Sequence, residues 1–335
     1  MLTKSERIKA LSSLGDWIRN HPDLEDILEK ARQENAFFIP RFSRNAIESI
    51  LGWHDTSVLE NWLQEIPETT HPKKVGLVLA GNIPLVGWHD LFSVFASGHF
   101  ACFKTSSQDK VLIEWLLNGL FEIYPESRAY FQKTENLKNA EALIATGSSN
   151  TAIHFDFYFR HVPRIIRGSK TSLGVLYGFE NEQELELLCD DVMMYFGLGC
   201  RNATKLLVPV GYDFGPFFNA LEKYRFVSDH HKFQNNAIYH KAIFLMNGTP
   251  FTDHDILMLR QDPSLFSPMS VLNYEEYENL EHAAQIIDGH RRDLQCLLSF
   301  QGKWEGSVPF GSAQNPGIDD YADGINTLSF LGSLA

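Results

Sequence analysis

The sequence predicts an α/β protein with two doubly wound domains and an N-terminal helical segment. The chain has 335 residues, and beyond about 250–300 residues a single hydrophobic core tends to split into domains. Short apolar segments alternate with longer helix-like segments twice along the chain, first from Val75 and again from Lys170. This repeated strand–helix order is typical of parallel sheets covered by helices.

Each segment of this pattern can be placed approximately. Residues 1–70 read as helices, because apolar residues recur at helical spacing from Ile8 to Ala31. Strands are expected at 75–80, 99–104, 141–146, 165–167, 171–177, 205–210, 270–274 and 294–300. Helices are expected at 86–97, 109–124, 150–159, 180–195 and 275–288. Residues 237–246 are expected to pair as a strand, and 311–317 to form a loop. The expected domains are 1–170 and 171–310, with 311–335 returning to the first.

Composition and charge exclude several classes of function. A net charge of −13 repels nucleic-acid backbones and anionic membranes. No apolar stretch approaches the ~20 residues of a membrane span, and the N-terminus lacks the apolar core of a signal peptide. The four cysteines show neither CxxC nor His–Cys spacing, so no disulfide framework and no metal site are expected. We therefore expect a cytoplasmic protein with reduced thiols.

Cys200 lies in the segment Phe196-Gly197-Leu198-Gly199-Cys200-Arg201-Asn202. Its two glycines allow the backbone to approach a ligand closely. Arg201 beside the thiol favours the thiolate, which is the nucleophilic form. A buried structural cysteine is the alternative interpretation, because free cysteines are often core residues.

Polar residues follow several expected strands. An amide at Asn82, within Gly81-Asn82-Ile83-Pro84, can donate to a developing oxyanion. Lys104 ends a strand and precedes hydroxyl-bearing residues, and Thr146–Ser149 resembles a phosphate cradle at a helix start. Each pattern alone is also typical of an ordinary turn or a solvated surface.

Taken in order, these segments resemble motifs of the aldehyde dehydrogenase superfamily. AGNIPLVGWHDLFSVFASGHFACFKTSS is similar to its PWNFPL…GN…KPSE stretch, and ATGSS to its TGS helix start. Gly168-Ser169-Lys170 stands where the family has LGGK, Gly197–Cys200 where it has GQxC, and SLFSP where it has EIFGP. VPFGSAQNPG resembles the closing PFGGxKxSG. Within the superfamily, SGHFACFKTSS and FGLGCRNATKLLVP most resemble LuxC-like acyl-CoA reductases (fatty acyl reductases).

The resemblance implies a role for each matching residue. Cys200 would be the nucleophile, and Asn82 with the Cys200 backbone amide would form the oxyanion hole. Lys104 would contact the adenosine ribose and Ser148 the pyrophosphate. The remaining implied cofactor-binding residues are Ser106, Ser107, Gly147, Gly168 and Phe266. NAD-selective relatives carry a Glu where Ser107 stands, so NADPH is the expected cofactor, with NADH also possible.

Two departures from the family pattern bear on the reaction. In many relatives a Glu stands just before the two glycines of the LGGK motif and activates water to hydrolyse an acyl-enzyme. This chain has Ile166-Arg167 at that place. Ser264 stands where many relatives have a Glu for the nicotinamide ribose. The expected activity is reduction of an acyl-CoA or acyl-carrier thioester to an aldehyde. An aldehyde-oxidising dehydrogenase and a cofactor-independent thiol acyltransferase stay open, as do a homo-oligomer and a complex with an acyl-activating partner.

Overall fold

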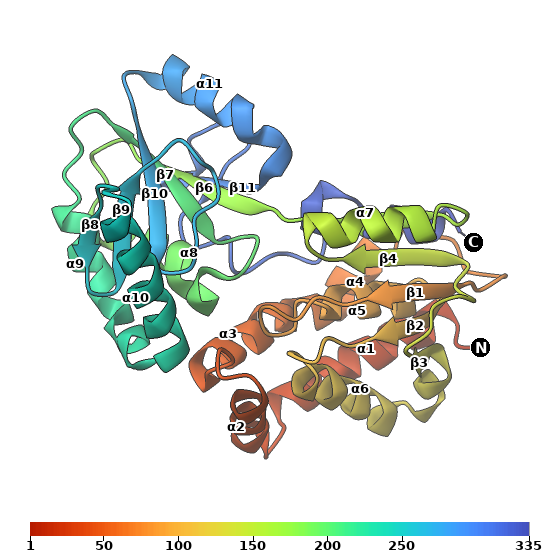
Figure 1. Ribbon diagram of the computed structural model, residues 1–335. Helices are drawn as coiled ribbons and strands as arrows, with labels where there is room; N and C mark the ends of the chain where they lie inside the picture. Colours follow the sequence, from red (N-terminus) through yellow and green to blue (C-terminus); the bar gives the residue numbers. More distant parts are fainter. Residues whose placement is uncertain (335) are drawn as a thin grey trace. The chain divides into compact units, whose positions relative to one another are not determined.

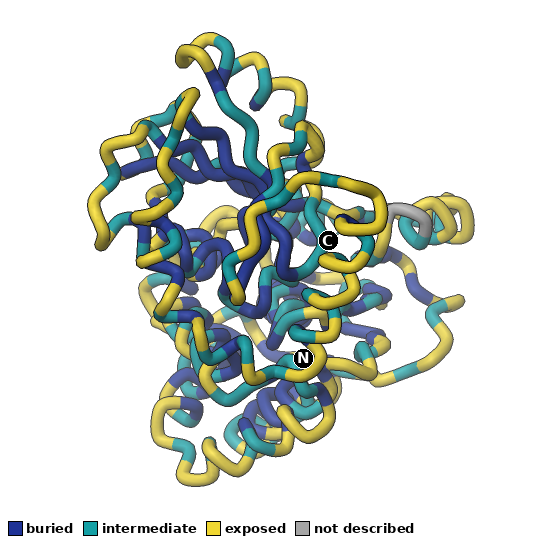
Figure 2. Tube along the Cα trace, turned by 60° about the vertical axis from the view of Figure 1, so that its left-hand side comes forward, coloured by how far each residue is buried: buried dark blue, intermediate teal, exposed yellow. Residues whose placement is uncertain are grey.

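The computed structural model describes residues 1–334, without the side chains of Ser149 and Asn150. The chain divides into two compact units. Unit 1 consists of Met1–Ser169 and the C-terminal segment from Pro316, and unit 2 of Lys170–Asn315. Each unit contains its own sheet with flanking helices (Figure 1). Buried residues lie along the interior of each unit, whereas exposed residues concentrate on its outer turns and loops (Figure 2).

Unit 1 contains a parallel sheet with the strand order β3-β2-β1-β4-β5. Its strands are β1 (Lys74–Val78), β2 (Phe100–Lys104), β3 (Phe131–Lys133), β4 (Ala142–Thr146) and β5 (Arg164–Arg167). The order reverses between β1 and β4, as in doubly wound sheets that bind ligands at their carboxyl edge. Because every pair is parallel, the loops that follow β1, β2, β4 and β5 open at that one edge.

The helices of unit 1 are α1 (Lys4–Arg19), α2 (Leu24–Glu34), α3 (Pro40–Leu51), α4 (Thr56–Trp62), α5 (Trp88–Ala96), α6 (Val111–Ile123), α7 (Ser149–Tyr158) and α12 (Thr327–Gly332). α1 packs on α5 and α6, and α12 packs on α5. Their apolar faces and the strands share one core cluster. The C-terminal segment is thereby built into the same unit as the N-terminal helices.

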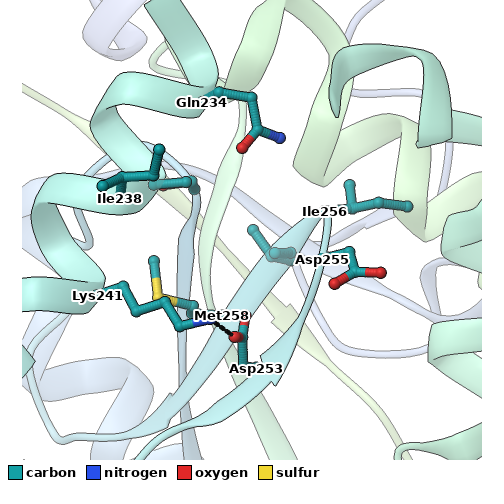
Figure 3. Close-up of a pocket in the computed structure, with 10 residues that line it drawn as sticks. Gln234, Ile238, Lys241, Asp253, Asp255, Ile256 and Met258 are labelled. Atoms are coloured by element: carbon teal, nitrogen blue, oxygen red, sulfur yellow. Dashed lines mark hydrogen bonds and ion pairs between the residues drawn. The ribbon is translucent and has the colours of Figure 1, made fainter. Parts of the chain in front are cut away.

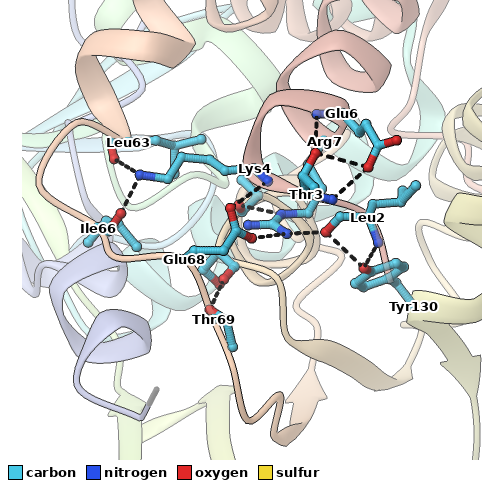
Figure 4. Close-up of polar contacts among 12 residues, drawn as sticks. Leu2, Thr3, Lys4, Glu6, Arg7, Leu63, Ile66, Glu68, Thr69 and Tyr130 are labelled. Atoms are coloured by element: carbon cyan, nitrogen blue, oxygen red, sulfur yellow. Dashed lines mark hydrogen bonds and ion pairs between the residues drawn. The ribbon is translucent and has the colours of Figure 1, made fainter.

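A buried arginine fastens the start of α1 (Figure 4). Arg7 is 1% exposed, and its guanidinium donates to the carbonyls of Leu2 and Ala96 and to the Glu68 carboxylate. Gly98 has a φ of +88°, and a Cβ there would lie 2.9 Å from Arg7 Cζ. The first helix is therefore held to the end of α5 by a group that needs glycine beside it.

Unit 2 contains a second sheet with the order β12-β11-β6-β7-β10-β9-β8. Its strands are β6 (Thr171–Val175), β7 (Ala203–Pro209), β8 (Thr252–His254), β9 (Leu257–Gln261), β10 (Val271–Tyr277), β11 (Leu294–Ser299) and β12 (Val308–Pro309). Its helices are α8 (Glu182–Met193), α9 (Gly215–Leu221), α10 (His231–Met246) and α11 (Leu280–His290). Within residues 170–315 every strand pair is parallel except β8 with β9.

The predicted fold class is confirmed, but two predicted segments differ from the structure. Residues 237–246 form the second half of α10 and not a strand. The ring of His230 caps this helix by accepting from the Phe233 amide. Phe233 and Phe244 are buried while Ile238 is 63% exposed, so the apolar residues follow a helical face. In addition, β10 extends to Tyr277, where a helix was expected from Glu275. Among residues 1–334, no helix has the length and apolar character of a membrane span.

Candidate functional site

The residues expected to bind the cofactor in unit 1 share the carboxyl edge of its sheet. They come from the ends of four adjacent strands: Asn82 after β1; Lys104, Ser106 and Ser107 at and after β2; Gly147 and Ser148 after β4; and Gly168 after β5. Sequence positions almost ninety residues apart are thus gathered at one edge by parallel pairing. Cys200 and Phe266 belong to unit 2.

The loops after β1 and β2 pack against each other at Gly81. A Cβ on Gly81 would lie 2.4 Å from both Cβ and Oγ of Ser106. No side chain fits at that distance, so this contact requires glycine. The loop that carries Asn82 and the loop that carries Ser106 and Ser107 are therefore in direct contact.

Lys104 and Ser148 each have a local polar partner. The Lys104 ammonium pairs with Glu135 at 2.6 Å, and both side chains are largely exposed. Exposed ion pairs contribute about 0–1 kcal/mol, so exchanging Glu135 for a ligand oxygen costs little. Ser148 is the N-cap of α7, and its hydroxyl accepts from the Thr151 amide at 3.3 Å. The amides of such a helix start attract anions.

In unit 2, a turn with unusual backbone conformation leads into Cys200. Tyr195, Phe196 and Gly197 have φ values of 53°, 59° and 73°. Left-handed conformation costs roughly 1–2 kcal/mol for each residue with a Cβ, so two such residues persist only where their surroundings hold them. The hydrogen bonds of Asn202 provide much of this stabilisation.

Asn202 and Ser172 fix the Cys200 turn from two sides. The Asn202 side chain accepts from the Gly199 amide at 2.8 Å and donates to the carbonyls of Asp191 and Met194, both at 2.9 Å. The Ser172 hydroxyl donates to the Cys200 carbonyl at 3.0 Å and accepts from the Cys296 amide at 3.1 Å. Asn202 and Ser172 are both fully buried, so the backbone on each side of the thiol is fixed.

The four cysteines differ in their surroundings. Cys200 is partly exposed, whereas Cys102, Cys189 and Cys296 are buried. Burial raises the pKa of the Cys189 thiol and, to a smaller extent, that of Cys102. Arg201, which the sequence placed beside Cys200, has its Nη1 atom 3.4 Å from the Cys296 sulfur. Cys200 is therefore the most accessible thiol of the chain.

The segment that contains Phe266 is held through its carbonyls. The Lys205 ammonium donates to the Pro263 carbonyl at 2.6 Å, the Thr204 hydroxyl to that of Leu265 at 2.8 Å, and the Asn273 amide to the carbonyls at 264 and 266 at 2.9 and 3.1 Å. Four successive carbonyls are thus matched by side chains of β7 and β10. Because Thr204 and Lys205 follow Cys200 closely, the structure ties the Phe266 segment to the strand that begins after the thiol.

Comparison with solved structures identifies the architecture. A Mycobacterium tuberculosis aldehyde dehydrogenase complexed with NAD+ superimposes with a TM-score of 0.64 at 14% identity, covering 89% of this chain and 73% of the other. A betaine aldehyde dehydrogenase from Staphylococcus aureus in complex with NAD+ gives 0.66 at 12% identity, covering 89% and 71%. An aldehyde dehydrogenase from Bacillus cereus gives 0.65 at 13% identity, again covering 89% and 71%. The fold is that of the aldehyde dehydrogenases. At the level of sequence, neither a protein-family model nor any curated protein matches the chain.

Within this aldehyde dehydrogenase fold, Arg167 forms a buried ion pair. Its guanidinium donates to both carboxylate oxygens of Asp90 at 2.8 Å and to the Thr327 hydroxyl at 2.7 Å. Arg167 and Asp90 are both buried. Such a bidentate pair is geometrically specific, and it joins β5, α5 and α12 within unit 1. Arg167 is therefore a structural residue.

Asp191 binds the loop that corresponds to the VPFGS motif. Its carboxylate accepts from the amides of Gly311 at 2.6 Å and Ala313 at 3.3 Å. Burial raises the pKa of Asp191 to about 7, although the two amides oppose this shift. Since the Asp191 carbonyl also accepts from Asn202, one residue of α8 supports both the thiol turn and the motif loop.

Sequence patterns did not identify the supporting residues Asp191, Asn202, Ser172, Lys205 and Asn273. A polar residue inside an otherwise apolar strand or helix was the available signal, because such residues are buried only when hydrogen-bonded. Their partners are mainly backbone groups, which sequence does not specify.

A hollow of about 140 Å³ lies between α10 and the β8–β9 hairpin (Figure 3). Gln234, Ile238, Met258 and the ion pair of Lys241 with Asp253 line it. None of the residues expected from the sequence to bind ligand lies there. Within the described part of the chain, no group of three His, Cys, Asp or Glu side chains is arranged for a metal ion.

Proposed function

We propose that the chain is a NAD(P)H-dependent reductase of acyl thioesters that works through an acyl-Cys200 intermediate. The observation that carries this proposal is the Cys200 turn. It presents the one partly exposed thiol of the four on a backbone fixed by buried Ser172 and Asn202. Nucleophilic catalysis needs an accessible thiol at a fixed position. The resemblance of its motifs to those of LuxC-like reductases supports the substrate class of this proposal.

The chemistry proceeds in two half-reactions. The Cys200 thiolate attacks the acyl carbonyl, the carbon–sulfur bond to CoA or a carrier breaks, and the departing thiolate takes up a proton. The Asn82 amide and the Cys200 backbone amide donate to the oxyanion, and each such donor is typically worth ~2.7–4 kcal/mol of barrier. NAD(P)H, when bound, would supply the hydride that the acyl carbon accepts. The bond from that carbon to Cys200 then breaks, which releases an aldehyde and restores the thiolate.

The residues at the carboxyl edge of unit 1 fit a dinucleotide. At Gly81 the β1 loop packs directly on the Ser106 side chain of the β2 loop. In this proposal Lys104, at the end of β2, and Ser106 hold the adenosine ribose, and the α7 start at Gly147 and Ser148 holds the pyrophosphate. Ser107 is exposed and carries no charge, so it does not repel the 2′-phosphate of NADPH. Gly168 and Phe266 complete the proposed set.

The end of β5 supplies no general base for hydrolysis of the acyl-enzyme, and this favours reduction. Ile166 has no acid–base group, and Arg167 stays charged in its pair with Asp90. General-base assistance is commonly worth ~10²–10⁴-fold, so an acyl-enzyme without it hydrolyses slowly. The acyl group then leaves either as aldehyde or back to a thiol. An aldehyde-oxidising dehydrogenase would run the redox reaction in the opposite direction. A thiol acyltransferase would use no nicotinamide cofactor.

The decisive experiment supplies purified protein with a panel of acyl-CoAs and follows NADPH absorbance. Mass spectrometry without cofactor should detect the acyl-enzyme, and added CoA should recover the acyl group. Cys200→Ala should abolish labelling, whereas the matched control Cys296→Ala should retain it. Labelling of Cys102, Cys189 or Cys296 would refute the assignment. Rapid release of free acid without cofactor would indicate a hydrolase, and failure to bind NAD(P)H an acyltransferase.

A further inference from the structure

Asp109 is a buried carboxyl group with one unmatched oxygen. It lies between Lys104, the end of β2, and Val111, the start of α6, and is 2% exposed. Its Oδ2 atom accepts from the Leu85 amide at 2.7 Å. Its Oδ1 atom is fully buried and has no hydrogen-bond partner among residues 1–334. Buried carboxylates are normally paired or fully hydrogen-bonded, so this arrangement requires an explanation.

Asp109 contacts both ends of the loop that carries Asn82. At one end, a Cβ on Gly81 would lie 3.3 Å from Asp109 Cβ, next to its closer contact with Ser106. At the other end, the Asp109 carboxylate holds the amide of Leu85, which has a φ of +60°. A leucine in this left-handed region is strained, and the hydrogen bond from its own amide helps to hold it there. Asn82 lies between these two fixed points.

A neutral side chain would hold the Leu85 amide at lower cost. Serine, threonine or asparagine accept one amide hydrogen bond without the desolvation penalty of a carboxylate. Glu34 of α2 and Lys110 line the hollow beside Asp109, yet Asp109 forms no ion pair within the described residues. The carboxyl group is thus retained without a compensating cation, beside the loop expected to bind the cofactor.

We propose that Asp109 is a positioning residue that couples the cofactor-binding loop at 105–109 to the loop that presents Asn82. This inference rests on the proposed function, in which Asn82 stabilises the oxyanion. Occupation of Ser106 and Ser107 shifts the segment that carries Asp109, and the contacts at Gly81 and Leu85 transmit the shift to Asn82. Its second oxygen provides an acceptor for the liganded arrangement of these loops.

A double-mutant cycle tests whether Asp109 acts through Asn82. Acylation rates of Cys200 are measured with NADPH present for the wild type, Asp109→Ala, Asn82→Ala and the double variant. Loss of one oxyanion donor typically costs ~10²–10³-fold. Asp109→Ala should cost roughly tenfold or more in the wild type, but less than about twofold in the Asn82→Ala background, because residues that act as a unit are non-additive. Asp109→Asn, whose amide oxygen still accepts from Leu85 but whose NH₂ group replaces the second acceptor, should recover only part of the rate.

Independent losses in the two backgrounds would overturn the inference, since a general structural defect does not depend on Asn82. KM for the acyl-CoA should change little in Asp109→Ala, because the defect lies in oxyanion stabilisation. If Asp109→Ala does not fold, Asp109→Leu keeps the volume while removing the acceptor and replaces it in the cycle.

Hydrogen exchange gives a readout that does not need activity. Peptides covering 81–86 should exchange faster in Asp109→Ala than in the wild type, and NADPH should slow their exchange only when Asp109 is present. Thr69→Val is the matched control, because it removes another buried hydrogen bond of unit 1, from the Thr69 hydroxyl to the Ser97 carbonyl. If acyl-CoA never labels the wild type, the proposed function fails, while the exchange data still decide the coupling. Unchanged exchange in Asp109→Ala would refute it.

Discussion

Two buried aspartates hold candidate functional loops, one in each unit, and they do so differently. Asp191 of unit 2 is 0% exposed, and its two carboxylate oxygens accept from the amides of Gly311 and Ala313. Asp109 of unit 1 is 2% exposed and holds the Leu85 amide with one oxygen only. Burial raises the pKa of both groups to about 7.

The number of matched carboxylate oxygens distinguishes a fixed support of a loop from one that can change its hydrogen-bond partner. Around the Cys200 turn, buried side chains use their hydrogen-bonding capacity on backbone groups, which suits a nucleophile that must stay in place. Around Asn82, one acceptor is left without a donor, which suits a loop whose partner changes during a reaction cycle. The following predictions test this contrast.

The largest effect is expected from Asn202→Ala. It removes hydrogen bonds to Gly199, Asp191 and Met194 and leaves buried backbone groups unmatched. The free energy of unfolding should fall by roughly 3 kcal/mol, and the acylation rate by roughly 10²-fold, because small displacements of a nucleophile are costly. Urea unfolding and mass-spectrometric acylation assays measure the two effects. Asn236→Ala, which removes an exposed amide bonded to the Lys232 carbonyl, should change neither.

Asparagine substitutions should distinguish the two aspartates. Asp191→Asn turns an amide NH₂ group toward one of the two backbone donors, so it should lower the free energy of unfolding by about 2–3 kcal/mol. Asp109→Asn keeps an acceptor for Leu85 and should cost less than about 1 kcal/mol at pH 5. Urea denaturation of both variants at the same pH compares them. Equal losses would contradict the distinction between a satisfied and an unsatisfied carboxyl.

The stability of Asp109→Asn relative to the wild type should depend on pH. A carboxyl whose pKa is higher in the folded chain holds its proton more tightly there, so it favours folding most below the unfolded pKa of about 4. This advantage is lost as pH rises toward the folded pKa of about 7. Asparagine does not ionise, so the variant should gain stability relative to the wild type between pH 5 and pH 8, by about 1 kcal/mol or more. A constant difference would show that Asp109 titrates normally.

The smallest effect concerns cofactor selection at the β2 loop. Ser107→Glu places a carboxylate where the 2′-phosphate of NADPH is proposed to lie. Because the site is exposed and screened, NADPH should bind roughly fivefold more weakly, about 1 kcal/mol. NADH binding should change less, since it lacks that phosphate. Fluorescence titration with both cofactors, with Ser107→Gln as the uncharged control, measures the difference. Equal losses for the two cofactors would remove Ser107 from the ribose site.

The alternation of short apolar segments and amphipathic ones predicted the fold class correctly, since burial in a parallel sheet imposes that pattern. It failed at α10, where Ala237–Met246 has strand-like apolar content but a buried face set by Phe233 and Phe244. It also missed β8 and β9, because strands of three and five residues carry little periodicity.

Motif order located the candidate residues Cys200, Asn82 and Lys104, because chemistry restricts which residue types can stand there. It did not locate Asp109 or Lys205. Asp109 bonds an amide 24 residues away, and Lys205 a carbonyl 58 residues away. Such pairs depend on how distant segments pack, and any residue except proline supplies the same backbone donor.

The carbonyl contacts of segment 263–266 have a consequence for redesign of the protein. Thr204, Lys205 and Asn273 hold its main chain, so the path of this segment does not depend on its exposed side chains, whereas Leu265 belongs to the core of unit 2. Exposed positions such as Phe266, which is 45% exposed, can therefore be exchanged without redirecting the backbone. Variant libraries that select for altered ligand preference can therefore be built at the exposed positions of this segment, provided that Thr204, Lys205 and Asn273 are kept.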